Sequence, residues 1–137
     1  MKTKLYFAYG ANMHPLSMKY RCPQATPVQQ FNLRDWELAF YNHATILPNQ
    51  DSYVPGVLWA VTDECESYLD QFEGYPTYYT KQTWKQDGVE FFFYEMTPEN
   101  RAGKPGQGYV SNIADSYDYW SIPADTLKAV AYADYAY

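Results

Sequence analysis

At the middle of the chain stands the stretch Leu69-Asp70-Gln71-Phe72-Glu73-Gly74-Tyr75-Pro76. Its last residues predict the end of a helix, because Gly74 suits a left-handed cap and Pro76 prevents the helix from continuing. Glu73 then falls in the last turn, where the negative end of the helix dipole disfavours a carboxylate by about 0.3–1 kcal/mol. Helix stability alone therefore does not explain this glutamate.

The helix that leads into this stretch is predicted from residue spacing. Asp63 can cap it, Glu66 stands at the third helical position, and apolar side chains recur at i, i+3, i+4 and i+7. These side chains are Cys65, Tyr68, Leu69 and Phe72. On a helical wheel Glu73 lies about 90° from the middle of the stripe and Asp70 about 150° away. We therefore expect Glu73 to be half-buried, and Asp70 to point into solvent and to be dispensable.

Two interpretations of Glu73 follow from this placement. A partly desolvated carboxyl group next to helix-end carbonyls has a raised pKa, which suits a group that takes and returns a proton near neutral pH. Alternatively, Glu73 is a helix-terminal residue that only hydrogen-bonds a neighbouring loop. The rest of the chain has to decide between them.

Length and composition exclude several classes of protein. The 137 residues fit a single domain, residues 1–137, and the net charge of −6 with ten scattered Lys and Arg argues against a nucleic-acid partner. Sixteen Tyr and four Trp favour a sheet-rich fold with a tyrosine-lined surface or cleft. The apolar run after the basic start is too short for a signal peptide, and no stretch reaches the length of a membrane span. We expect a cytoplasmic protein with no membrane partner.

The cysteines and histidines do not form a pattern that binds metal. Cys22 and Cys65 show no Cys-x-x-Cys or Cys/His spacing, so we expect two buried free thiols. His14 and His43 have no obvious metal partner, and a surface or hydrogen-bonding role is expected for each. The sequence therefore predicts no metal site.

Near the start of the chain, a strand, a glycine turn and a helix start lie close together. Residues 5–9 are almost wholly apolar or aromatic, as in a strand buried on both faces. Gly10-Ala11-Asn12 follows, and Pro15 suits the first turn of a helix preceded by Asn12 or His14. Such a junction gathers unpaired backbone N–H groups that can bind a carboxylate or phosphate. A simple turn is the alternative.

The remaining elements follow from alternation and turn residues. Asp87-Gly88 between two alternating runs predicts a β-hairpin. Tyr94 on its second strand could present its hydroxyl to an inner cavity, or it could be an ordinary core residue. Further expectations are a loop at 21–30, a strand at 34–42, an exposed turn at 49–52, a strand at 56–61, a mobile loop at 99–108, a helix at 122–130 and no assignment for 131–137.

Together these pieces resemble the gamma-glutamylcyclotransferase family, including its AIG2-like members. Tyr9-Gly10-Ala11-Asn12 is similar to a loop of the family in which Tyr and Gly are followed by Ser or Thr and then by Asn. Residues 69–74 follow about sixty residues later, in the expected order. The resemblance covers roughly residues 4–130. Ala11 departs from the commoner Ser or Thr, so a hydroxyl contact from that position is missing, whereas its backbone N–H remains.

The resemblance implies an α+β fold with a small, mixed, barrel-like β-sheet and a few short helices. It also implies that Glu73 is the catalytic acid/base. The residues implied to hold the substrate are Tyr9, Gly10, Ala11, Asn12, Tyr79 and Tyr94.

The implied reaction cyclises a γ-glutamyl peptide or γ-glutamyl amine. The substrate's own α-amine attacks its γ-carbonyl, which gives 5-oxoproline and releases the amine. Because the nucleophile comes with the substrate, positioning alone can contribute about 7–11 kcal/mol, and one residue, Glu73, moves the proton. The reaction needs a small-molecule substrate and no cofactor. The alternative is a non-catalytic binding or regulatory module that uses the same cavity.

Overall fold

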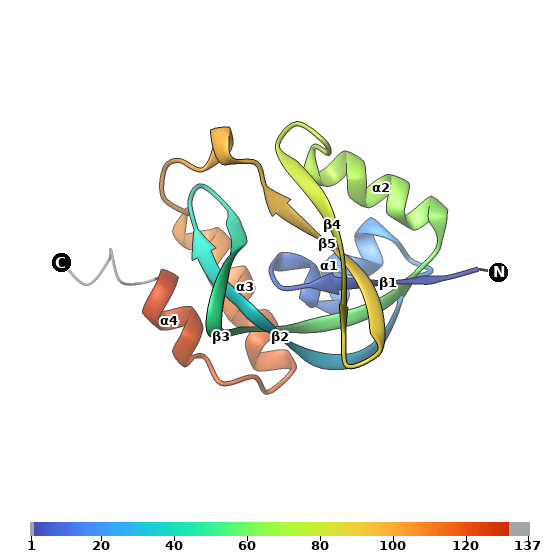
Figure 1. Cartoon of the computed structure of the whole chain (residues 1–137), viewed down its shortest axis with the longest axis horizontal. Coiled ribbons are helices and arrows are strands. Elements are labelled where there is room, and N and C mark those ends of the chain that lie inside the picture. The colour runs from blue at the N-terminus through green and yellow to red at the C-terminus, as the bar shows by residue number, and fades with distance from the viewer. Residues whose placement is uncertain (1, 132–137) are drawn as a thin grey trace.

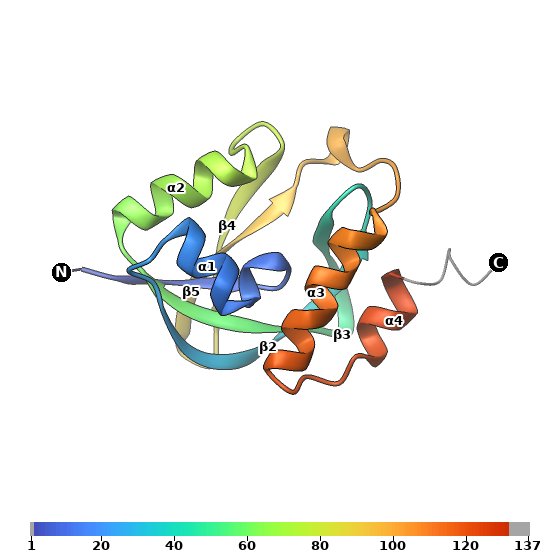
Figure 2. The ribbon, with the colours of Figure 1, turned by 180° about the vertical axis from the view of Figure 1, so that it is seen from behind.

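The structure is a computed structural model that describes residues 2–131 (Figure 1). It has the α+β class that the resemblance implied. Its elements are, in order, β1 (Lys4–Ala8), η1 (Ala11–Met13), α1 (Pro15–Arg21), β2 (Thr26–Phe40), β3 (Ala44–Val61), α2 (Asp63–Glu73), β4 (Tyr79–Gln86), β5 (Val89–Met96), η2 (Pro98–Asn100), α3 (Gln107–Tyr119) and α4 (Asp125–Ala131). In the rear view of Figure 2, α1 and α3 lie in front of the strands.

The five strands form one mixed sheet in the order β2-β3-β1-β5-β4. Neighbours are antiparallel except for β1 and β5, which run parallel where Tyr6 faces Phe92. The central place of β1 explains its apolar sequence, since both of its faces are covered. The carboxyl ends of β1 and β5 lie at the same edge of the sheet, which brings the loop after Ala8 close to the end of β5.

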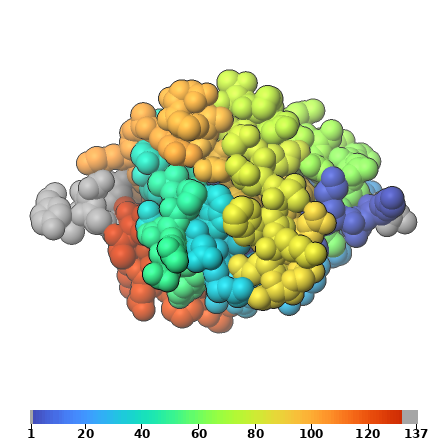
Figure 3. Space-filling model, viewed as in Figure 1, coloured from blue at the N-terminus to red at the C-terminus, as the bar shows by residue number. Residues whose placement is uncertain are grey.

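The two outer strands approach each other, so that the sheet closes toward a barrel. The backbone N–H of Arg34 on β2 donates to Gln86 Oε1 on β4 at 2.9 Å. The rings of Trp36 and Trp84 meet edge to face, 5.4 Å apart. In the space-filling view of Figure 3, the yellow β4–β5 hairpin and the blue-green part of β2 and β3 lie side by side. These contacts fit the expected barrel-like sheet.

Helix α2 ends as predicted but begins differently. Its N-cap is Thr62, whose hydroxyl accepts from the Cys65 N–H at 3.2 Å, so the expected cap at Asp63 is wrong and Asp63 is the first helical residue. At the other end Glu73 is the last helical residue and Gly74 adopts the left-handed conformation with φ of 66°. The carboxylate of Glu73 therefore lies in the last turn.

The β-strands are longer than predicted. The hairpin at Asp87-Gly88 is confirmed, and both residues have the positive φ of a tight turn. Strand β2 already begins at Thr26, inside the expected loop at 21–30, because an edge strand tolerates Pro27. Residues 49–52 form no separate turn: they bulge out of β3 opposite a break in the register of β2.

The C-terminal helices were predicted less well. Helix α3 was not predicted, and its first residues fall within the expected loop at 99–108. The final helix begins only at Asp125, so Pro123 precedes it and is not in its first turn. Ala131 ends α4, and the rest of the expected tail lies outside the described residues. No helix of the described part is long and apolar enough to cross a membrane.

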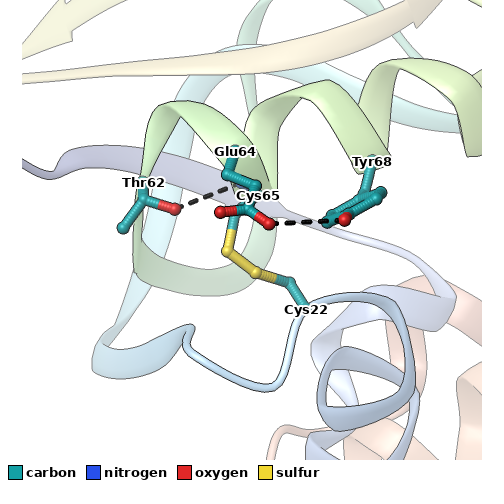
Figure 4. Close-up of a disulfide and its surroundings, with 5 residues drawn as sticks. All are labelled: Cys22, Thr62, Glu64, Cys65 and Tyr68. Carbon is teal, nitrogen blue, oxygen red and sulfur yellow. Dashed lines mark hydrogen bonds between the residues drawn. A yellow bond between two sulfur atoms is a disulfide. The ribbon is translucent and has the colours of Figure 1, made fainter.

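The expectation of two free thiols is wrong, because Cys22 and Cys65 form a disulfide (Figure 4). Cys22 directly follows α1 and Cys65 lies in the first turns of α2, and their Cα atoms are 5.4 Å apart. The absence of a Cys-x-x-Cys spacing argued against a metal site. It could not indicate a disulfide partner 43 residues away. We call residues 9–12 the glycine loop. The bond joins α1, the helix after this loop, to α2, the helix that carries Glu73.

We expect reduction of this disulfide to lower the free energy of unfolding by about 2–4 kcal/mol, because the bond closes a loop of 43 residues in the unfolded chain. Urea unfolding with and without dithiothreitol measures the difference. A Cys22→Ser, Cys65→Ser double variant should match the reduced protein and should not respond to the reductant. Equal unfolding midpoints for the oxidised and reduced wild type would contradict this prediction.

Candidate active site

A cavity of about 180 Å³ lies between the loop after β1, the end of α2 and strands β4 and β5. All seven site residues implied by the resemblance line it, from four separate parts of the chain. They are Tyr9, Gly10, Ala11, Asn12, Glu73, Tyr79 and Tyr94. The glycine loop and the end of α2 therefore meet at one cavity, although about sixty residues separate them.

Glu73 reaches the cavity because it continues the buried row of α2. Cys65, Leu69 and Glu73 follow one another at intervals of four residues, and the first two are fully buried. Burial raises the pKa of Glu73 to about 7, and the positive charge of Arg21 opposes this rise. No described residue forms a hydrogen bond or an ion pair with the Glu73 carboxylate. It therefore does not serve as a tether to a neighbouring loop.

The loop after β1 supplies hydrogen-bond donors. Within residues 2–131, the backbone N–H groups of Gly10, Ala11 and Asn12 have no acceptor, as expected at the start of the short helix η1. Gly10 has a φ of −123°, outside the left-handed region that favours glycine. A Cβ at Gly10 would come no closer than 3.8 Å to its neighbours, the nearest being the Tyr109 hydroxyl. The open space beside Gly10 belongs to the cavity.

Asn12 adds an unsatisfied acceptor. Its side chain is buried, and its Nδ2 donates to the Tyr6 hydroxyl at 3.2 Å. The Oδ1 atom of the same amide has no hydrogen-bond partner among the described residues. Because a buried polar atom without a partner costs about 1–3 kcal/mol, Oδ1 favours a ligand that donates a hydrogen bond.

The three tyrosines implied by the resemblance all donate their hydroxyl protons to acceptors of the protein itself. Tyr9 donates to the Tyr94 carbonyl at 2.6 Å, Tyr79 to the Ala44 carbonyl at 2.5 Å, and Tyr94 to Asp70 Oδ1 at 2.6 Å. Burial raises the pKa of each of these three phenols, so they stay protonated. Their oxygens can still accept a hydrogen bond, which adds to the acceptor character of the cavity.

The expectation for Asp70 is wrong. Its carboxylate accepts from the Tyr94 hydroxyl and lies 2.8 Å from Lys81 Nζ, and only 27% of its side chain is exposed. The helical wheel failed because Tyr68 and Phe72, which were counted in the apolar stripe, are 49% and 47% exposed. The true inward face is rotated away from them and toward Asp70.

Six further residues line the cavity, although the sequence did not assign them to it. They are Tyr6, His43, Ala44, Phe72, Tyr78 and Tyr109. His43 has the expected hydrogen-bonding role, since its Nδ1 lies 2.8 Å from the Tyr78 hydroxyl. The Tyr109 hydroxyl accepts from the Ala44 N–H at 3.0 Å. Tyr109 lies on α3, the helix that was not predicted, so no signal in the sequence pointed to it.

His14 also has the expected role. It precedes α1, and its Nδ1 accepts from the Leu16 N–H at 3.2 Å as a helix cap. No group of three His, Cys, Asp or Glu side chains that could hold a metal ion occurs in the described part of the chain.

Solved structures with the same fold include two at 26% sequence identity. One is an uncharacterized protein from Homo sapiens, with a TM-score of 0.82 over 95% of this chain and 89% of that chain. The other is titled a gamma-glutamyl cyclotransferase, with a TM-score of 0.82 over 94% of this chain and 88% of that chain. YkqA from Bacillus subtilis shares the fold at 18% identity, with a TM-score of 0.73 over 94% of this chain and 53% of that chain.

A search of curated proteins finds no match. The sequence profile of the family described as gamma-glutamyl cyclotransferase, AIG2-like, matches residues 6–115, which include both the glycine loop and the end of α2. The chain therefore belongs to the gamma-glutamyl cyclotransferase, AIG2-like family.

Proposed function

We propose that this protein is a gamma-glutamyl cyclotransferase that converts a γ-glutamyl peptide or γ-glutamyl amine to 5-oxoproline and a free amine. The observation that carries the proposal is the meeting of two unlike groups in one cavity. Glu73 supplies a carboxyl group with a pKa of about 7, and residues 10–12 supply backbone N–H groups without acceptors. A γ-glutamyl group presents both an ammonium and a carboxylate, which match these two sides.

The roles follow from the chemistry of each group. The N–H groups of residues 10–12 hold the α-carboxylate of the substrate. The Asn12 Oδ1 and the tyrosine oxygens accept from the α-ammonium, which keeps the nitrogen near the γ-carbonyl. Holding this geometry turns the attack into a well-oriented ring closure.

Glu73 then moves protons from one nitrogen to the other. Its carboxylate takes a proton from the α-ammonium, and the freed amine attacks the γ-carbonyl carbon to form the new C–N bond of the ring. As the old C–N bond breaks, Glu73 returns this proton to the leaving nitrogen, then takes a second proton from the ring nitrogen and passes it to the departing amine, which leaves as an ammonium ion. Glu73 ends the cycle as it began, and the substrate is divided into 5-oxoproline and an amine.

The alternative is a binding or regulatory module that holds the same ligand without turnover. Glu73 favours the enzyme over this alternative. A module that only binds an ammonium is better served by a carboxylate that stays ionised, whereas a pKa of about 7 lets Glu73 exchange a proton near neutrality.

The direct test is to incubate the protein with a panel of γ-glutamyl peptides and γ-glutamyl amines and to measure 5-oxoproline by mass spectrometry. The panel also identifies the leaving group. We expect release of 5-oxoproline from at least one compound. Tight binding of a panel member without any release would favour the binding module.

A second test varies the pH. A rise in pH should increase activity but decrease the free energy of unfolding. Activity needs ionised Glu73, so kcat/KM should rise with pH through about 7. The folded-state pKa of Glu73 is raised from 4.5 to about 7, so its contribution to stability is complete below pH 4.5 and is lost as pH rises through 7. That loss is about 3 kcal/mol when complete. Unfolding and activity profiles between pH 4.5 and 8.5 measure both changes.

A further inference from the structure

A chain of charged groups leads from the cavity wall to the surface. Tyr94 lines the cavity, and its hydroxyl donates to Asp70 Oδ1 at 2.6 Å. Asp70 is paired with Lys81 at 2.8 Å, and Lys81 is paired with Glu66 at 2.6 Å. Lys4 closes the series at 2.7 Å from Glu66. None of the four charged residues lines the cavity itself.

This chain of contacts holds the Asp70 carboxylate in one place. The side chains of Lys81 and Glu66 are only 17% and 16% exposed, so water competes little for their charges. The Lys81 ammonium also lies 4.5 Å from the centre of the Tyr75 ring, which restricts its side chain further. Asp70 is therefore a fixed acceptor rather than a flexible surface residue.

The position of Asp70 sets which way the Tyr94 hydroxyl points. A phenol has one proton to donate, and the Asp70 carboxylate is the strongest acceptor that this hydroxyl contacts in the described structure. With its proton directed to Asp70, the Tyr94 oxygen can only accept from a ligand in the cavity. The ammonium of a γ-glutamyl group needs an acceptor of this kind.

We propose that Asp70 is a positioning residue, which holds the Tyr94 hydroxyl with its proton outside the cavity so that the oxygen accepts from the substrate ammonium. The inference rests on the proposed cyclotransferase function and extends it to a residue that does not touch the substrate. Asp70 acts through Tyr94, and Lys81 holds Asp70 in place.

Removal of the side chain at position 70 should reverse this arrangement. Asp70 Oδ1 contacts both the Tyr94 hydroxyl, at 2.6 Å, and Lys81 Nζ, at 2.8 Å. In Asp70→Ala this acceptor is gone, and the phenol proton is free to point into the cavity. Tyr94 then changes from an acceptor to a donor that faces a cation.

The test is a double-mutant cycle of Asp70→Ala and Tyr94→Phe, with kcat/KM for 5-oxoproline release as the readout. We expect each single variant to lose about ten- to hundredfold, because each removes one acceptor of a charged group. The double variant should lose no more than Tyr94→Phe alone, since Asp70 has nothing left to position. A residue that only stabilised the fold would give additive losses instead.

Glu64→Gln is the matched control. It changes an exposed carboxylate on the same helix that belongs neither to this chain of contacts nor to the cavity lining, and its kcat/KM should stay within about threefold of the wild type. If Asp70→Ala fails to fold in a thermal melt, the cycle is run with Asp70→Glu, which keeps the charge but moves the carboxylate. The same absence of further loss in the double variant is then expected.

The outcomes separate this inference from the proposed function. A wild-type protein that releases no 5-oxoproline overturns the proposed function. An active wild type with a fully active Asp70→Ala, or with additive losses in the double variant, overturns only the role of Asp70.

Discussion

Replacing Glu73 by Gln should abolish 5-oxoproline release from every γ-glutamyl compound that the wild type accepts. The amide keeps the shape of the side chain but cannot take the proton from the α-ammonium. A positioned acid or base contributes about 10²–10⁴-fold, and the loss should reach the upper end because Glu73 is the only carboxylate among the described residues that line the cavity. An assay of 5-oxoproline by mass spectrometry detects a residual rate of this size.

The fold of the variant is checked on the same sample. Because Glu73 is half-buried and has no hydrogen-bond partner among the described residues, Gln should not destabilise the protein, and at pH 8 it should unfold at a higher temperature than the wild type. Glu64→Gln is the matched control, since Glu64 lies exposed on the same helix and should leave turnover unchanged. Full activity of Glu73→Gln would overturn the proposed mechanism. A lower melting temperature at pH 8 would instead support a structural role for this carboxylate.

The end of α2 could be predicted because its signals are local. Gly74 and Pro76 act through their own backbone preferences, so the position of Glu73 in the last turn needed no knowledge of the rest of the fold. The turn at Asp87-Gly88 was predicted for the same reason. The pairing of the glycine loop with Glu73 did not follow from local signals, and it became an expectation only through the family resemblance.

The rotation of α2 could not be read from its sequence. Tyr68 and Phe72 look like core residues, yet both are about half exposed, and Phe72 instead packs against the Arg21 guanidinium at 3.4 Å. Large aromatic side chains on this surface shifted the apparent apolar stripe away from the true buried face. For this reason the helical wheel placed Asp70 in solvent and gave no indication of its contact with Tyr94.

Contacts between distant segments were the other source of error. The Cys22–Cys65 disulfide and the contact of Tyr109 with Ala44 join residues 43 and 65 positions apart, and neither has a signature in local spacing.

Replacing Gly10 by Val should remove binding of 5-oxoproline while the protein stays folded. A Cβ at Gly10 would meet no neighbour closer than 3.8 Å, so the substitution causes no steric clash at that atom. The two methyl groups beyond it would occupy part of a cavity of only about 180 Å³ and cover the N–H groups of the loop. NMR titration with 5-oxoproline should show at least about a tenfold weaker Kd, equivalent to 1.4 kcal/mol.

Ala11→Ser tests whether side chains or backbone groups of this loop hold the ligand. If the contact is made through the N–H of Ala11, a serine hydroxyl should change the Kd by less than about twofold, within the usual range of a substitution that removes no contact. Gly10→Ala should fall between wild type and Gly10→Val, because it adds one carbon to the open space. Unchanged binding in Gly10→Val would mean that the ligand lies away from the loop, and Glu73 would then have no bound carboxylate opposite it to orient the substrate.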